Sequence, residues 1–291
     1  STLGRALLQL MPPGGAVHGR VELGGRDLVG ASAAELRDVR GKDVALVFQE
    51  PMTRLDPLMR VSDHFVEAIR AHRPDTARGE ARAMGRAALA QMGIPPTRTD
   101  NYPHEFSGGM RQRIMIALGI VLRPQLVIAD EPTTALDVIV EAQILDILDA
   151  LRRDASVGLI LITHNLGIVA ETCDRVAVMY AGKIVEIGDV RQVFTAPKHP
   201  YTKGLLASTI SLETTRLHSI DGTPPDLVVP PPGCRYAPRC PYVMAHCTDA
   251  VPLYAEPEPG QLAACYLYPG ANADGRATPR EDAGAGAELA R

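Results

Sequence analysis

The chain has 291 residues, with 34 acidic and 30 basic side chains, and its formal net charge is -4. This balance excludes a broad positive field for nucleic acid, and the lack of tryptophan with only 4% aromatic residues argues against a base-stacking surface. The longest strongly apolar run, residues 114–122, is about half the length of a membrane-spanning helix. No basic segment precedes the N-terminal apolar stretch and no small-residue cleavage site follows it, which predicts a cytoplasmic protein without a signal peptide.

The first third of the chain predicts alternating short elements. Residues 1–10 predict a helix that ends at the Pro- and Gly-rich segment 11–15. Residues 19–28 alternate around a Gly-Gly pair, a pattern typical of a short antiparallel hairpin. The compact apolar run 44–48 predicts a buried strand, and residues 60–99, rich in Ala, Arg and Met at helical spacing, predict a helical insertion.

The middle of the chain predicts a parallel sheet. Residues 126–129 and 159–162 read as buried strands, and the helical segment 138–153 between them makes a βαβ unit. Residues 176–180 and 183–187 predict a closing hairpin. The fold class expected is therefore α/β.

Composition changes from residue 196 onward. Proline and cysteine become more frequent and periodicity fades, which predicts a weakly structured segment. Residues 270–291 have little apolar bulk and predict a disordered tail.

Polar residues suited to phosphate chemistry follow three of the predicted strands. Gln49 follows the first, Asp130 and Glu131 end the second, and His164 follows the third. In open parallel sheets ligands bind beyond the carboxyl ends of the strands, so these side chains predict one site.

Each of these residue types has a chemical role at such a site. Asp130 can hold Mg²⁺, which prefers few carboxylates and many waters, and Glu131 can accept a proton from an attacking water. His164 can contact a γ-phosphate, and Gln49 can reach the metal or the water. The simpler alternative is that Asp130 and Glu131 only cap the helix that follows.

A second candidate site is a Ser-Gly-Gly turn. Ser107, Gly108 and Gly109 open a predicted helix, and a turn of this kind exposes amides and a helix dipole that favour anions. Alone the triplet is a weak signal, but its position ahead of Asp130 strengthens it.

Together these motifs resemble the ATPase family of ABC transporters. FSGGMRQR resembles the family's signature motif, LVIADEP its Walker B motif, and TALD, which ends at Asp137, its D-loop. Gln49 matches the Q-loop and His164 the H-loop, and the order and spacing fit over residues 1–195. The resemblance implies a RecA-like P-loop NTPase core with an inserted helical subdomain. It also implies a head-to-tail dimer in which one subunit's signature contacts the nucleotide held by the other.

A narrower resemblance is to the oligopeptide/dipeptide importer branch. It rests on VFQEPMTRLDP, NYPHEFSGGMRQR, PKHPYTKGLLAS and the Cys-rich tail, and SGGM in place of SGGQ resembles the first of the branch's two paralogous ATPase subunits. This implies ATP hydrolysis that drives peptide import at the cytoplasmic face of the inner cell membrane. The partners implied are two membrane permeases, a second ATPase subunit (paralogous or identical) and an extracytoplasmic binding protein.

The domain organisation expected from the resemblance has three parts. An ABC ATPase domain covers residues 1–195 and contains a helical subdomain at about 55–123. An importer-type extension covers 196–269, and a disordered tail covers 270–291.

The start of the chain departs from the family pattern. The resemblance implies that Ser1 and Thr2 complete a P-loop, G-x-x-x-x-G-K-[ST], with Ser1 as a Mg²⁺ ligand, but the glycines and the lysine are not in this sequence. We therefore expect a sequence truncated within Walker A. The alternative is a half-site or regulatory subunit that donates only its signature to a partner's ATP.

Four cysteines lie in the segment after residue 196. Their spacing is looser than zinc sites usually show and does not match bacterial ferredoxins, so spacing leaves the metal open. The resemblance to the importer branch implies a [4Fe–4S] cluster, with zinc and unliganded thiols or disulfides as alternatives. The residues concerned are Cys234, Cys240, Cys247 and Cys265.

One rival from another class is an ABC ATPase of repair or translation that has no permease. It would predict basic patches or a tandem second ATPase unit, and the sequence contains neither.

Overall fold

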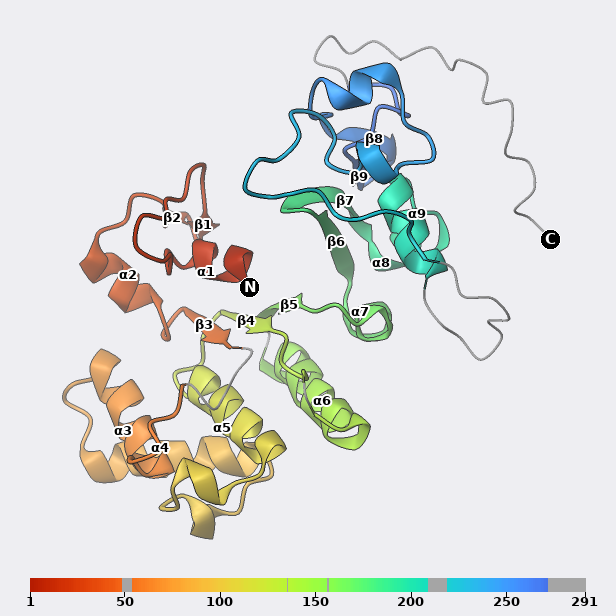
Figure 1. The fold of residues 1–291 in the computed structure, drawn as a ribbon. Helices are drawn as coiled ribbons and strands as arrows, with labels where there is room; N and C mark the ends of the chain where they lie inside the picture. The colour runs from red at the N-terminus through yellow and green to blue at the C-terminus, as the bar shows by residue number, and fades with distance from the viewer. Residues whose placement is uncertain (49–53, 135, 156, 209–218, 272–291) are drawn as a thin grey trace. The chain divides into compact units, whose positions relative to one another are not determined.

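The computed structural model describes residues 1–48, 54–134, 136–155, 157–208 and 219–271 (Figure 1). Two compact units, Ser1–His164 and Asn165–Arg291, are described separately below. Gln49 and almost all of the tail predicted to be disordered lie outside the described residues. The boundary expected after residue 195 stays a prediction.

The first unit is built on three parallel strands. β3 (Val44–Val47), β4 (Leu126–Asp130) and β5 (Gly158–Ile162) pair in that order, so that β4 is central. α6 (Val138–Ala155) connects β4 to β5. The predicted strands and their connecting helix are confirmed, and the carboxyl ends of the strands meet at one edge.

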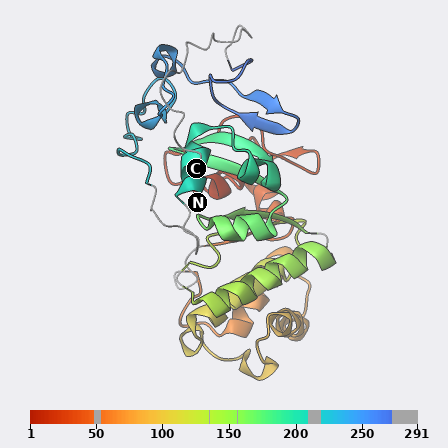
Figure 2. The ribbon, with the colours of Figure 1, turned by 90° about the vertical axis from the view of Figure 1, so that its right-hand side faces the viewer.

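The two faces of this sheet carry different layers, because successive strand residues point to opposite sides. On one face Val47 and Val127 join the core formed with α3 to α6, and Figures 1 and 2 show α5 and α6 on that side. On the other face Ile128 packs with α1 (Thr2–Leu7) and α2 (Ala33–Val39). The hairpin of β1 (Glu22–Leu23) and β2 (Arg26–Asp27) forms as predicted between these helices.

After β3 in the sequence, three helices form the layer on one face of the sheet. They are α3 (Val61–His72), α4 (Arg78–Gln91) and α5 (Gly108–Ile120), with the 3₁₀ turns η2 (Pro96–Arg98) and η3 (Pro103–Glu105) before α5. The helices approach closely because α4 carries Gly85, where an added Cβ would lie 2.7 Å from the ring of Phe65. The helical character predicted for residues 60–99 is confirmed.

The second unit is an antiparallel sheet with short helices. Its strand order is β6-β7-β9-β8, and the first two strands, β6 (Arg175–Tyr180) and β7 (Lys183–Asp189), form the predicted hairpin. Three helices accompany the sheet, namely α7 (Leu166–Thr172), α8 (Val190–Thr195) and α9 (Pro200–Ala207).

The segment after residue 196 is more ordered than its composition predicts. β8 (Ala255–Glu258) and β9 (Gln261–Ala263) extend the sheet, and β9 pairs directly with β7. The 3₁₀ turns η4 (Ala237–Arg239) and η5 (Ala245–Thr248) precede them. The prediction of a weakly structured segment is thus wrong for these residues. They are ordered by strand pairing, which the periodicity of the sequence did not predict.

A buried carboxylate fastens this added segment to β7. Glu186 has no exposed surface, and its carboxylate accepts hydrogen bonds from the backbone N–H of Lys198 at 2.8 Å and of His199 at 2.9 Å, and from Gln261 Nε2 at 2.8 Å. Three donors satisfy a charge that would otherwise be costly to bury. His199 is itself 1% exposed, and burial lowers the pKa of its imidazole to about 4.

Within the described ranges, none of the helices combines the length and the apolarity needed to cross a bilayer.

Candidate active site

The first candidate residue, Asp130, ends the central strand β4 and is buried, with 2% of its surface exposed. Its Oδ1 accepts a hydrogen bond from Ser1 Oγ at 3.0 Å. The contact forms because α1 lies close on the sheet: a Cβ on Gly4 would stand 3.1 Å from Ile162 Cδ1 and 3.2 Å from Ile128 Cγ2. A single carboxylate beside a hydroxyl suits Mg²⁺, which takes few protein ligands and keeps several waters.

Glu131 joins the ends of β4 and β5. Its backbone N–H donates to the carbonyl of Ile162 at 2.8 Å, and its φ of 49° lies in the left-handed region that residues other than glycine rarely adopt. Its carboxylate makes two contacts, Oε1 with His164 Nδ1 at 2.9 Å and Oε2 with the hydroxyl of Thr134 at 3.0 Å. The structure therefore brings Ser1, Asp130, Glu131 and His164 together at one sheet edge.

Two of these side chains differ sharply in exposure. The His164 side chain is 79% exposed, whereas that of Glu131 is 17% exposed. The carboxylate is thus partly shielded while the imidazole faces solvent, an arrangement in which a base can act on a water at the open side.

The Ser-Gly-Gly turn begins α5. Ser107 is the N-cap and accepts from the N–H of Met110 at 3.4 Å, while Ser107 and Gly108 are both exposed. Exposed amides at the start of a 13-residue helix suit an anionic group.

The turn also touches the start of α6. A Cβ on Gly109 would stand 2.5 Å from Val140 Cγ1, so only glycine fits there without displacement. Val140 in turn donates its N–H to Asp137 Oδ1 at 2.9 Å, and Asp137 is exposed. The signature-like turn and the D-loop-like Asp137 therefore share one set of contacts.

Sequence reasoning missed one residue of this edge, Thr134. Its signal was present in the chain, because a hydroxyl three positions after a candidate base can bond back to it across a turn, and the N–H of Thr134 does bond to the carbonyl of Glu131 at 3.3 Å. Thr2 opens α1, and Gln49 lies outside the described residues.

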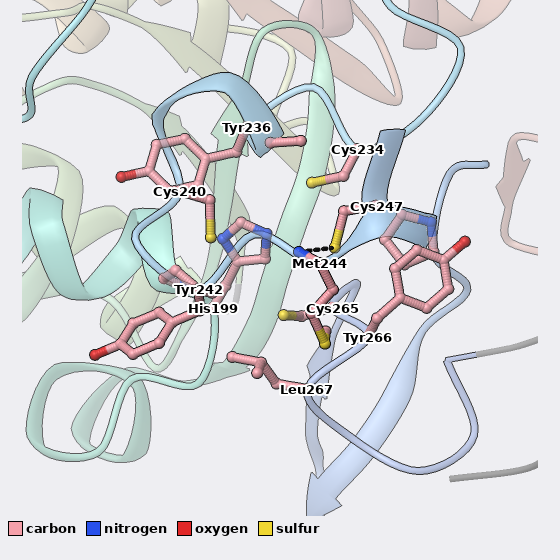
Figure 3. A pocket seen from close by; sticks show the side chains of 13 residues that line it. His199, Cys234, Tyr236, Cys240, Tyr242, Met244, Cys247, Cys265, Tyr266 and Leu267 are labelled. Atoms are coloured by element: carbon pink, nitrogen blue, oxygen red, sulfur yellow. Dashed lines mark hydrogen bonds between the residues drawn. The ribbon is translucent and has the colours of Figure 1, made fainter. Parts of the chain in front are cut away.

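The four cysteines of the second unit gather around a small hollow, shown in Figure 3. All four are free thiols. The hollow measures about 20 Å³, which is room for about one water molecule. Cys247 is buried and its sulfur accepts from the N–H of Met244 at 3.4 Å.

These thiols do not form a metal site, and the [4Fe–4S] prediction was wrong. In the part of the chain that the structure describes, no group of three or more His, Cys, Asp or Glu side chains is arranged to hold a metal ion. Burial raises the pKa of Cys240 to about 11 and that of Cys265 to about 12, so both thiols are harder to ionise than an ordinary cysteine. The prediction rested on the resemblance to the importer branch and not on the cysteine spacing, and the described side chains do not bear it out.

Comparison with protein families places both units. Residues 1–134 match the ABC transporter family, and residues 185–247 match the family described as the oligopeptide/dipeptide transporter C-terminal region.

Individual relatives agree with this. The chain is 47% identical over 258 residues to a dipeptide transport ATP-binding protein, DppD, of Bacillus subtilis, a match that covers 87% of the chain and 77% of the relative. It is 43% identical over 265 residues to the oligopeptide transport ATP-binding protein OppD of Salmonella typhimurium, covering 90% of the chain and 78% of the relative.

The fold is shared with solved ABC structures. The ATP-binding cassette MJ0796, solved as a dimer bound to ADP and phosphate, superposes with a TM-score of 0.57 at 22% identity, covering 65% of this chain and 80% of that one. The cbiO1 protein from Clostridium perfringens, part of a cbiONQ transporter complex, gives a TM-score of 0.56 at 27% identity over 67% and 74% of the two chains. The P-loop NTPase fold expected from the motifs is confirmed. The chain belongs to the ABC transporter family, in its oligopeptide/dipeptide ATP-binding branch.

Proposed function

We propose that this protein hydrolyses ATP to drive the import of dipeptides or oligopeptides as the nucleotide-binding subunit of an ABC transporter. The observation that carries the proposal is the convergence of Ser1 with Asp130, and of Glu131 with His164, at the carboxyl edge of the parallel sheet. Relatives named as dipeptide and oligopeptide transport ATP-binding proteins support the transported class. The alternative of a regulatory half-site subunit has no such support.

Asp130 and Ser1 form the metal side of the site. Mg²⁺ bound there would neutralise phosphate charge, and Asp130, buried at the end of β4, would hold it directly or through water. Ser1 would add its hydroxyl, and Thr2, next to it at the first turn of α1, would lie near the phosphates.

Glu131 acts as the general base. Its carboxylate accepts the proton of the attacking water, a contribution of roughly 10² to 10⁴ in rate. His164 holds one carboxylate oxygen at 2.9 Å, and its exposed ring would contact the γ-phosphate of bound ATP. Thr134 holds the other oxygen at 3.0 Å, which leaves the base few orientations. Gln49, which follows β3 in the sequence, would orient the water or the metal.

The signature residues serve a second nucleotide. Ser107, Gly108 and Gly109 bind the phosphates of ATP held by the opposite ATPase subunit, which is a paralogue or a second copy of this chain. Asp137 accepts a hydrogen bond from the N–H of Val140 at the start of α6 and would lie at the same subunit boundary. The exposure of Ser107 and Gly108 in the single chain is consistent with that role.

The remaining assignments concern partners and domains. The subunit would bind two membrane permeases from the cytoplasmic face of the inner membrane, as a peripheral protein, with substrate delivered by an extracytoplasmic binding protein. Residues at about 55–123 would be the helical subdomain within the ATPase domain 1–195, and 196–269 the importer-type extension. The three packed helices α3 to α5 and the match at residues 185–247 support these assignments.

The test is Glu131→Gln in the purified transporter complex. The amide keeps the shape of the side chain but cannot accept the proton, so we expect ATP binding within about twofold of wild type and a turnover lower by about 10² or more. Glu171→Gln, an exposed position on α7, is the matched control and should leave both unchanged.

The measurements are nucleotide binding by equilibrium dialysis and phosphate release. Undiminished phosphate release by Glu131→Gln would refute the base assignment. Peptide uptake into vesicles, measured on the same preparations, should fall in parallel with turnover, and uptake without ATP turnover would refute the proposed coupling.

A further inference from the structure

Arg98 belongs to η2, yet its guanidinium reaches the segment on both sides of the Ser-Gly-Gly turn. Before the turn, Nη2 donates to the carbonyl of Glu105 at 2.7 Å, and the guanidinium carbon lies 4.4 Å from the centroid of the Phe106 ring. After the turn, Nη1 lies 3.5 Å from Met110 Sδ. The Arg98 side chain thus contacts residues on both sides of Ser107, namely Glu105 and Phe106 before it and Met110 in the first turn of α5.

Other contacts also hold the segment before the turn. The N–H of Phe106 donates to the carbonyl of Pro103 at 3.2 Å, and the Phe106 ring is part of the buried core. The guanidinium of Arg60 lies 5.7 Å from the centroid of the Tyr102 ring. The Glu105 carboxylate accepts from the N–H of Tyr102 at 2.6 Å and from Asn101 Nδ2 at 3.1 Å, which closes η3 on itself. Arg111 Nε donates to the carbonyl of Phe106 at 2.8 Å from the α5 side. Among these contacts, only those of Arg98 are made from η2. In the sequence η2 comes before η3, and η3 comes before the turn.

The turn itself is exposed, so its shape depends on these flanks. Phe106 is 2% exposed, whereas the next two residues, Ser107 and Gly108, are exposed. Because the Phe106 ring is buried next to the exposed turn, the position of Phe106 sets the direction of the backbone amides that follow it.

We propose that Arg98 is a positioning residue for nucleotide binding by the signature turn, acting through Phe106 and Met110. This inference rests on the proposed function, in which Ser107 serves ATP held by the opposite subunit. A planar guanidinium can stack on a ring and donate in its own plane at the same time, which a lysine ammonium cannot do. Arg98 therefore holds the turn ready, so that ATP binding does not have to order it.

This role differs measurably from simple packing. If Arg98 only stabilised the α3–α5 layer, its loss would lower the melting temperature and leave the kinetics of the folded protein unchanged. If it positions the turn, its loss raises the KM for ATP while kcat at saturating ATP stays near wild type, because Asp130, Glu131 and His164 do not contact it.

The experiment compares Arg98→Ala, Arg98→Lys and Arg86→Ala in the transporter complex. Arg86 is exposed on α4, and Arg86→Ala serves as the control because it removes the same charge from the same helical layer. We expect KM for ATP to rise about tenfold in Arg98→Ala and to recover only in part in Arg98→Lys, with kcat within about twofold of wild type and Arg86→Ala unchanged.

A second readout needs no nucleotide. Amide hydrogen exchange of residues 102–110 in the nucleotide-free complex should speed up about tenfold in Arg98→Ala, and that of α3 and α4 should not change. Unchanged KM and exchange would overturn the inference, as would faster exchange spread evenly over α3 to α5 with a lowered melting temperature. The Glu131→Gln variant in the same series separates the two proposals: if it loses turnover while Arg98→Ala behaves as wild type, only this inference fails.

Discussion

Replacement of Gly109 by alanine tests the contact between the signature turn and α6. An added Cβ would stand 2.5 Å from Val140 Cγ1, whereas ordinary contacts are 3.4–4 Å, so the two helix starts must separate by about 1 Å. Val140 cannot turn away easily, because a β-branched side chain in a helix has one strongly preferred rotamer. At Gly108 an added Cβ would meet nothing within 4 Å, which makes Gly108→Ala the matched control.

The magnitude follows from these distances. Overpacking of this kind costs about 1–3 kcal/mol, while alanine at the open position is neutral or gains up to about 1 kcal/mol of helix propensity. We therefore expect Gly109→Ala to unfold with about 2 kcal/mol less free energy than Gly108→Ala, a melting temperature lower by roughly 4–8 °C.

The assay is urea unfolding followed by circular dichroism, with Val140→Ala added to each variant. Removing the valine methyl groups should relieve the clash, so Gly109→Ala and Val140→Ala should show a coupling of about 1 kcal/mol or more, and Gly108→Ala and Val140→Ala none. If Gly109→Ala proves as stable as Gly108→Ala, or the coupling is zero, the contact described here is not present in solution.

Two further predictions concern the second unit. His199 stays neutral in the folded protein down to about pH 4 but would take a proton near its ordinary value of 6.5 when unfolded, so the unfolded state binds more protons in that window. Stability should therefore fall as pH drops from about 6.5 to about 4, by about 3 kcal/mol in all, of which about 2 kcal/mol is lost between pH 7 and pH 5. In urea unfolding at these two pH values, His199→Asn should remove most of the loss of about 2 kcal/mol. Glu186→Ala leaves the backbone N–H groups of Lys198 and His199 without an acceptor, and leaves the Gln261 amide with only the carbonyl of Ala196. This should cost about 3 kcal/mol or more, against no change for the exposed Glu171→Ala, and a melting temperature equal to wild type would contradict the buried network.

The cysteine segment shows where sequence reasoning failed in this protein. The resemblance of its motifs identified the family correctly. The same resemblance also predicted an iron–sulfur cluster that the described side chains do not support. A ligand set depends on the direction and ionisation of each sulfur. Here burial raises the pKa of both Cys240 and Cys265.

The amino-acid sequence by itself predicted the elements of the first unit except α2, together with the chemistry at its sheet edge. Apolar runs marked β3, β4 and β5, and because parallel strands end at a common edge, Asp130, Glu131 and His164 could be expected together before any distance was known. The family followed from motifs that are continuous in the chain.

Only the tertiary structure decided contacts between residues that no local pattern links. The pairing of β9 with β7, the burial of Glu186 under Gln261, and the reach of Arg98 across the signature turn all join segments whose own periodicity is weak or unrelated. The periodicity of apolar residues shows which face of an element is apolar, so it predicts whether a segment is a helix or a strand. Distances between side chains depend on how elements pack, as when the bare backbone of Gly109 lets α5 approach Val140.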